Sequence, residues 1–208
     1  MKKILVIIII FLSSCSPSNE NKQSNDNTSN TGIESSGEIK KIVVGNKDAK
    51  ITIITFESLT CSHCANFHKD VYPHLKEEYI DTGLAKIEFR HFPLDIAAFN
   101  ASKISQCKND GSSKILDSLI LNQHRWVKGS TEEEINGYLK TFLDEEGIDI
   151  DFNKCIESKK IEDFVLNDRI SGVKKFKVNA TPTIIINNEK FEKSLNYKNL
   201  KKALEKLI

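Results

Sequence analysis

The feature that most constrains this chain is the motif Cys61-Ser62-His63-Cys64, which stands between two segments of different periodicity. Residues Ile51–Phe56 before it are β-branched and almost continuously apolar, as is typical of a buried parallel strand. After it, an apolar residue recurs at every fourth position from Phe67 to Tyr79, which predicts a helix from Cys61 to about Ile80. The motif therefore lies where a strand ends and a helix begins.

A thiol at the N-terminus of a helix faces unpaired backbone N–H groups and the positive end of the helix dipole, and both stabilise a thiolate. Such cysteines have pKa values between roughly 3.5 and 7.5, against about 8.5 for a free cysteine. We therefore predict that Cys61, at the exposed start of the helix, is the attacking sulfur, and that Cys64, one turn further in, resolves the mixed disulfide. His63 either stabilises the Cys61 thiolate or is an exposed residue without influence.

The other segments predict an α/β domain that is interrupted by helices. Strands are expected at Ile39–Val44 and Ala85–Phe89, and the second completes a βαβ unit with the strand and helix of the motif. Strand residues return at Thr183–Ile186, with Asn187-Asn188 as a hairpin turn into 190–192, and a last helix starts near Tyr197. Only helical patterns occupy residues from about 93 to 178, at Ile96–Cys107, Lys114–Gln123, Glu132–Asp144 and Ile161–Phe176.

Three local signals refine these helices. Thr60 or Ser58 is expected to cap the helix that follows the strand, and Pro73 should kink it. Thr131 with Glu134 matches a capping box at the start of a later helix.

The N-terminus carries the signals of export. Two lysines precede an apolar run from Ile4 to Leu12, which is short for a permanent membrane span but suits a secretion signal. Small residues before Cys15 resemble a lipoprotein processing box, so we expect residues 1–15 to be a signal peptide that ends at a lipidated Cys15; the alternative is a plain signal peptide. Residues 16–37 are Ser/Asn-rich and predict a disordered tether to a domain at 38–208.

A second candidate element is Thr181-Pro182, because a proline that opens an apolar strand indicates either a cis peptide or an ordinary trans lead-in. The patterns TFESLTCSHCANFH, HFPLDIAAFNASKISQC and NATPTIIINNEKF together resemble the DsbA-like branch of the thioredoxin superfamily, over roughly residues 39–208. The resemblance implies a thioredoxin-like fold with a helical insertion. It also implies that Pro182 is cis and packs beside the Cys-x-x-Cys motif, and that Thr181 presents its backbone to a substrate bound as an added strand.

The same resemblance implies an activity: the introduction of disulfide bonds into reduced, exported client proteins, followed by reoxidation by a membrane oxidoreductase. We expect a monomer in the periplasm or cell envelope, lipid-anchored to a membrane, that needs no organic cofactor. A disulfide isomerase or reductase of the same fold is the nearer alternative. The formal net charge of +1 gives no reason to expect a nucleic-acid partner.

Two departures from the family pattern leave the direction of electron flow open. Relatives often have proline directly after the first cysteine, where this chain has Ser62, and many have a buried acid at the position of Thr55, where it helps to move the proton of the second cysteine. Glu57 is the nearest acid here; it either replaces the buried acid or, as we expect, lies exposed at the strand end.

Cys107 and Cys155 both fall in the helical insertion and remain as a possible pair once Cys15 carries lipid. Some DsbA-like proteins have a second disulfide in this region, which favours a structural disulfide over a redox-regulatory pair. In an oxidising compartment such a bridge would persist. In the chain-entropy model it would stabilise the fold by about 4 kcal/mol.

A metal site is the alternative from a different class of function. Cys61, Cys64 and His68 have ligand-like spacing on a helix, and His74 and His91 are the other candidate ligands. Only three ligands are local, whereas a structural zinc site needs four, and His68 is expected on a solvated helix face. A metal-binding lipoprotein is therefore the less favoured hypothesis, and we predict no bound metal.

Overall fold

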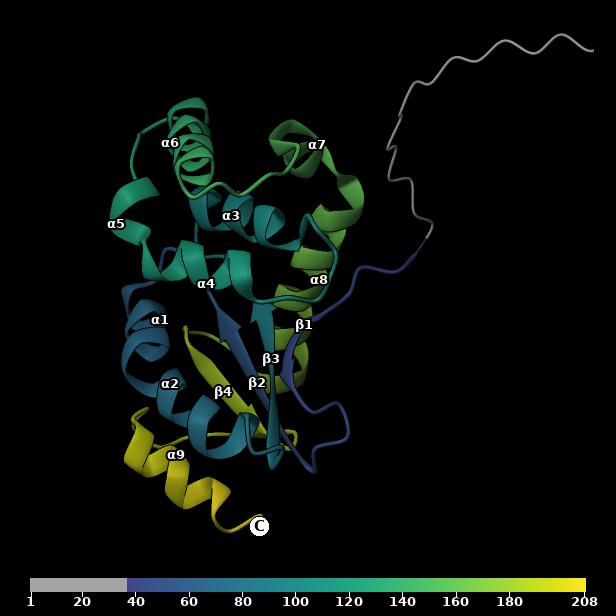
Figure 1. Ribbon diagram of the computed structural model, residues 1–208, viewed down its shortest axis with the longest axis vertical. Coiled ribbons are helices and arrows are strands. Elements are labelled where there is room, and N and C mark those ends of the chain that lie inside the picture. Colours follow the sequence, from purple (N-terminus) through teal and green to yellow (C-terminus); the bar gives the residue numbers. More distant parts are fainter. Residues whose placement is uncertain (1–36) are drawn as a thin grey trace, which may run out of the picture. The chain divides into compact units, whose positions relative to one another are not determined.

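The computed structural model describes residues 37–208, so the expected signal peptide, Cys15 and nearly all of the tether lie outside the described residues. Within that part, five strands form one sheet in the order β1-β3-β2-β4-β5 (Figure 1). The strands are β1 (Ile42–Gly45), β2 (Ile51–Glu57), β3 (Ala85–His91), β4 (Thr183–Ile186) and β5 (Glu189–Lys190).

Strand β2 is paired on both sides, parallel to β3 and antiparallel to β4. Its successive side chains serve two separate cores: Ile53 packs with the helices that follow the motif, and Ile54 and Phe56 pack with Phe176 on the other face. Because both faces are covered, the strand is apolar almost throughout rather than alternating. The α/β class predicted from the sequence is confirmed.

The helix after the motif runs from residue 62 to residue 80 and changes its pitch along the way. It consists of α1 (Ser62–Asn66), η1 (Phe67–Val71), α2 (Tyr72–Leu75) and η2 (Lys76–Ile80), in which the two η segments have wide, π-type turns. Pro73 lies in the first turn of α2, directly after η1. A widened turn is one way for a helix to accommodate a residue that lacks a backbone N–H group.

The N-cap expected for this helix was wrong. Cys61 itself is the N-cap, in an extended backbone conformation, and no side chain caps the helix. Ser58 and Thr60 instead contact each other, at 3.2 Å between their hydroxyl oxygens. The first backbone N–H groups of the helix are therefore not satisfied by a hydroxyl and are left to face the Cys61 sulfur.

The helical insertion stands between β3 and β4, and its helices α3 to α7 lie beyond the carboxyl ends of β2 and β3 (Figure 1). The capping box of Thr131 and Glu134 is confirmed. The two shortest helices, α5 and α7, were not predicted because they hold too few residues to show a helical period. The helices are α3 (Ile96–Gln106), α4 (Lys114–Leu121), α5 (Gln123–Trp126), α6 (Glu132–Glu145), α7 (Phe152–Glu157) and α8 (Lys159–Phe176).

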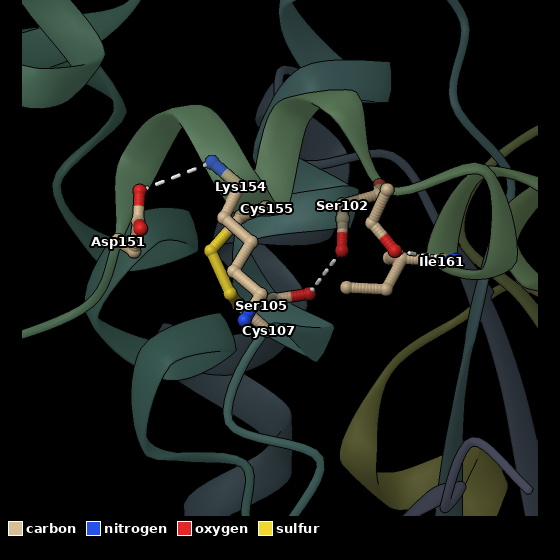
Figure 2. The surroundings of a disulfide bond; sticks show 8 residues. Ser102, Ser105, Cys107, Asp151, Lys154, Cys155 and Ile161 are labelled. Atoms are coloured by element: carbon tan, nitrogen blue, oxygen red, sulfur yellow. Dashed lines mark hydrogen bonds between the residues drawn. A yellow bond between two sulfur atoms is a disulfide. The ribbon is translucent and has the colours of Figure 1, made fainter. Parts of the chain in front are cut away.

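A disulfide joins Cys107, at the end of α3, to Cys155 in α7, with 5.4 Å between the two Cα atoms (Figure 2). The buried ammonium of Lys103 donates a hydrogen bond to the carbonyl oxygen of Ile156, so α7 is held to α3 at two points. The Asp151 side chain caps α7 by accepting the backbone N–H of Lys154.

The chain returns to the sheet through a hairpin and ends on a helix. Asn187 and Asn188 both have positive φ angles, 46° and 72°, as a tight hairpin turn requires, so the predicted turn is confirmed. The strand after it, β5, begins one residue earlier and is shorter than expected. The last helix, α9 (Tyr197–Leu204), places the buried residues Leu200 and Leu204 in the same core as Ile53.

Candidate active site

The two motif cysteines differ in their exposure to solvent. Cys61 is half-buried at the N-terminus of α1, whereas Cys64 is completely buried. Both carry free thiols in this structure. One helical turn separates them, so the outer sulfur can be reached from solvent and the inner one cannot.

The Cys61 sulfur lies against the loop that precedes β4. Its Sγ is 3.3 Å from the carbonyl oxygen of Thr181, and the peptide bond between Thr181 and Pro182 is cis. The sheet explains this contact, because Phe56 of β2 pairs with Thr183 of β4. The residues just after β2 and just before β4 are therefore brought to the same edge of the sheet.

The environment of Cys61 favours its thiolate. A hydrogen bond from the Cys64 thiol lowers the pKa of Cys61 most strongly, burial opposes this, and the net result is a pKa of about 5. The backbone N–H groups of Cys64 and His63 lower this pKa further. Cys61 is therefore a thiolate at neutral pH, in the state that attacks disulfides.

Cys64 is shifted in the opposite direction. Burial raises its pKa most, and the hydrogen bond that it donates to Cys61 and the negative charge of Glu57 raise it further. Cys64 therefore holds its proton while Cys61 is a thiolate. The two sulfurs of one motif therefore differ in protonation at neutral pH.

Glu57 is not exposed, and the expectation that it lies in solvent at the strand end was wrong. Only 2% of its surface is accessible, at the last position of β2. Thr55, which stands where relatives carry the buried acid, donates its hydroxyl to Glu57 Oε1 at 2.8 Å. The site therefore has a buried carboxylate whose charge acts on Cys64. It belongs to Glu57, two positions after Thr55 along the strand.

His68 is the partner of this carboxylate, so its expected place on a solvated helix face was also wrong. It is 3% exposed, and its Nε2 lies 2.7 Å from Glu57 Oε2. The sequence did contain a signal for the burial of His68. It follows Cys64 by four residues, so both side chains lie on the same buried face of the helix. What the sequence did not show is the carboxylate opposite it.

The other ring nitrogen of His68, Nδ1, lies 3.3 Å from Oδ1 of Asp117, in helix α4 of the insertion. Burial lowers the pKa of His68, but the charges of Glu57 and Asp117 outweigh burial and raise it to about 9. His68 is therefore an imidazolium between two carboxylates at neutral pH.

Sequence reasoning also missed Gln123, in the short helix α5. Its side-chain Nε2 donates hydrogen bonds to the carbonyl oxygens of Leu59, at 2.8 Å, and of Cys61, at 3.0 Å. These two bonds fix the backbone on either side of Thr60, up to the N-cap residue Cys61. No sequence signal identified this contact, because Gln123 was expected only as the last residue of the helix Lys114–Gln123 and has no recognisable spacing to the motif.

His63 is exposed, and it lines an open groove of about 470 Å³ beside the cysteines. The groove is also lined by Phe67 and Val71 of the helix and by Pro182 and Leu195. The backbone N–H of His63, rather than its ring, lowers the pKa of Cys61.

The candidate metal ligands do not come together. Within residues 37–208, no group of three or more His, Cys, Asp and Glu side chains is placed to hold a metal ion. His68 contacts carboxylates, His74 stacks on Tyr197 with 5.0 Å between ring centres, and the buried His91 contacts Gln106 at 2.9 Å. In the same part of the chain, no helix is long and apolar enough to cross a bilayer.

Comparison with known proteins agrees with this fold. The thioredoxin family profile matches residues 38–206. A Rickettsia bellii protein with the provisional name protein-disulfide oxidoreductase is 30% identical over 172 residues, which cover 80% of this chain and 64% of the relative. The chain thus spans just under two thirds of the length of the first rickettsial relatives that it matches.

Solved structures show the same likeness. The crystal structure of Wolbachia pipientis alpha-DsbA1 matches with a TM-score of 0.69 and 30% identity, over 80% of this chain and 90% of that one. Oxidised BdbD from Bacillus subtilis matches with a TM-score of 0.63 over 80% of this chain and 91% of that one, and at 21% identity this shows a shared fold alone.

Fold and site together define a thioredoxin-fold protein with paired cysteines at a helix N-terminus and a helical insertion. The chain belongs to the thioredoxin family, in its DsbA-like branch. The fold implied by the sequence resemblance, a thioredoxin-like α/β fold with a helical insertion, is confirmed.

Proposed function

We propose that the protein is a thiol–disulfide oxidoreductase that introduces disulfide bonds into exported proteins. The observation that carries this proposal is the opposite effect of the site on its two thiols: Cys61 is favoured as a thiolate and Cys64 is held as a thiol. Stabilising the Cys61 thiolate stabilises the reduced protein, and this makes its disulfide a stronger oxidant. The same observation favours an oxidase over an isomerase or a reductase.

The reaction begins with an oxidised Cys61–Cys64 pair. A client thiolate attacks the Cys61 sulfur, the bond between the two site sulfurs breaks, and its electron pair leaves on Cys64, which takes up a proton. A second client thiolate then attacks the client sulfur of the mixed disulfide and releases Cys61 as a thiolate. The client gains one disulfide and loses two electrons, and the protein gains the same two electrons.

In this cycle Glu57 exchanges the proton of Cys64, because it is the buried carboxylate whose charge acts on that thiol. Thr181 offers its backbone to the client as an added strand, and the groove beside Pro182 takes client side chains. His63 contributes its backbone N–H to the Cys61 thiolate.

Reoxidation of the reduced pair requires a partner that accepts two electrons, and we assign this step to a membrane oxidoreductase of the cell envelope. The lipid on Cys15 would keep the protein, acting as a monomer, near that membrane. We assign the disulfide between Cys107 and Cys155 a structural role, because Cys155 is completely buried and joins two helices of the insertion.

Two measurements test the activity. The oxidised protein is mixed with a reduced peptide that contains two cysteines, and peptide oxidation is followed by mass spectrometry. We expect stoichiometric oxidation, none with Cys61→Ser, and a trapped mixed disulfide when reduced Cys64→Ser meets an oxidised peptide. The potential of the pair is then measured against a glutathione buffer. A value as low as thioredoxin's, about −270 mV, would exclude the oxidase assignment and favour a reductase.

A further inference from the structure

Glu57, His68 and Asp117 form a row of charged side chains between the end of β2 and helix α4. Glu57 is the last residue of β2, and its charge acts on the Cys64 thiol. The ring of His68 lies between Glu57 and Asp117, 2.7 Å from the first carboxylate and 3.3 Å from the second. The side chains of Glu57 and His68 are 2% and 1% exposed, whereas that of Asp117 is 31% exposed. Solvent therefore reaches the outer member only.

The groups around His68 explain why it is charged. Glu57 faces it from β2 and Asp117 from α4, while Tyr72 from its own helix and Phe89 from β3 place their rings 5.4 Å and 5.2 Å away. Burial raises the pKa of Tyr72, which stays neutral. A buried carboxylate without a counter-charge is costly and takes up a proton instead. The imidazolium of His68 supplies that counter-charge to Glu57.

Asp117 is held for this role by its own helix. Its second oxygen, Oδ2, accepts a hydrogen bond of 2.7 Å from the hydroxyl of Ser113, which leaves Oδ1 directed at His68. The insertion thus reaches back to the helix that carries both cysteines. The charge that Asp117 adds keeps the proton on His68 although the ring is buried.

We propose that His68 and Asp117 are positioning residues for the exchange reaction: Asp117 holds the charged ring of His68, and that ring holds the Glu57 carboxylate in place to take the proton of Cys64. This inference rests on the proposed function. Its step is the resolution of a mixed disulfide at Cys61. The Cys64 thiol gives its proton to Glu57, its sulfur attacks Cys61, and the other thiolate leaves. Glu57 then releases that proton to solvent, and His68 keeps its own charge throughout.

The reaction of the reduced protein with oxidised glutathione separates this step from the first one. Cys61 attacks glutathione disulfide and forms a mixed disulfide, and Cys64 then resolves it and releases a second glutathione thiol. Both steps are followed by acid quenching and mass spectrometry across the pH range. Variants His68→Gln and Asp117→Asn remove one charge each and retain the size of the side chain. His124→Gln and Asp149→Asn, at exposed positions, are the matched controls.

With His68→Gln we expect the first step to be unchanged and the second to slow by at least about tenfold at neutral pH. The difference should vanish above about pH 9, where His68 of the wild type loses its own charge. Asp117→Asn should slow the same step less. The double variant should be no slower than His68→Gln alone, because Asp117 acts through His68. The control variants should match the wild type.

An unchanged second step in His68→Gln, or a slowing that is equal at all pH values, would overturn the inference while the proposed function stands. A wild type that forms no mixed disulfide at Cys61 would overturn the proposed function itself, and this role with it. If His68→Gln does not fold, the NMR titration of His68 in Asp117→Asn decides. A midpoint clearly below the wild-type value supports the link, and an unchanged midpoint refutes it.

Discussion

The sulfur of Cys61 lies 3.3 Å from the carbonyl oxygen of Thr181, although the two residues are 120 positions apart in the chain. One belongs to the first βαβ unit and the other to the loop before the C-terminal hairpin. The antiparallel pairing of β2 with β4 brings them together. The candidate active site therefore exists only when both ends of the domain share one sheet, so folding and site assembly are a single event.

The first prediction concerns the thiolate at this contact. In the reduced protein, Cys61 should titrate with a midpoint of about 5, because hydrogen bonds to its sulfur lower its pKa from 9.0. The ultraviolet absorbance of the thiolate measures this directly. Because folding lowers this pKa, ionisation of Cys61 stabilises the folded, reduced protein. This contribution is complete above about pH 9 and is lost as the pH falls through about 5.

The matched variant for this titration is Cys64→Ala, which removes the largest contribution to the Cys61 pKa. Its midpoint should move up toward the ordinary cysteine value, while Cys61→Ser should show no titration in this range. A wild-type midpoint near the ordinary value of about 8.5 would contradict the geometry described for the site.

The sequence was sufficient for the main elements of the fold. Apolar runs and four-residue spacing predicted β2, β3, β4 and the helix that follows the motif, because each is long enough to show its period. Turn residues were equally informative, as Asn187-Asn188 shows. The likeness to DsbA-like proteins predicted the cis peptide at Pro182, which the residues alone left undecided between cis and trans.

The charged interior of the site was not predictable in the same way. Glu57 and His68 were both expected in solvent, because a single charged residue at a strand end or on a helix is usually exposed. Their burial depends on each other and on Asp117, and these residues come from three elements whose packing no local pattern encodes. The contact of Gln123 with the backbone around Cys61 was missed because it joins residues more than 60 positions apart, and no local pattern encodes such a contact.

The second prediction is a pH dependence of stability that arises from His68. Its pKa is raised from 6.5 to about 9, so its contribution is complete below about pH 6.5 and is lost as pH rises through about 9. The loss should be at most about 3 kcal/mol. Urea unfolding of the oxidised protein, in which Cys61 does not titrate, measures it. His68→Gln should lack this loss and His124→Gln should keep it; identical curves would contradict the ion pairs.

The third prediction separates the second disulfide from the redox centre. Replacing both Cys107 and Cys155 by serine opens a loop closed across 48 positions, which should cost about 4 kcal/mol in the free energy of unfolding. The potential of the Cys61–Cys64 pair should not change, since the disulfide joins α3 to α7 and the motif opens a different helix, α1. A shift in that potential would instead indicate a regulatory pair.

The fourth prediction tests the contact of Gln123 with the backbone around Cys61. Gln123→Glu keeps the shape of the side chain but removes both donated hydrogen bonds and places a carboxylate against two carbonyl oxygens. We expect a loss of about 1–3 kcal/mol in unfolding free energy and a slower reaction of Cys61 with oxidised glutathione. Gln123→Ala should lose less stability, because it adds no repulsion. Equal losses in both variants would argue against the two bonds.

The last prediction tests how tightly α8 packs on the strand that leads to Cys61. A Cβ atom at Gly172 would lie 2.8 Å from Cε1 of Phe56, closer than packed atoms allow, and Phe56 is fully buried. Gly172→Ala should therefore destabilise the protein by about 1–3 kcal/mol, although alanine is the better helix former. Gly137→Ala, in α6 with nothing within 4 Å of the added carbon, should instead stabilise by about 0.5–1 kcal/mol. Thermal unfolding of both variants decides, because only a contact between Gly172 and Phe56 gives the two substitutions opposite signs.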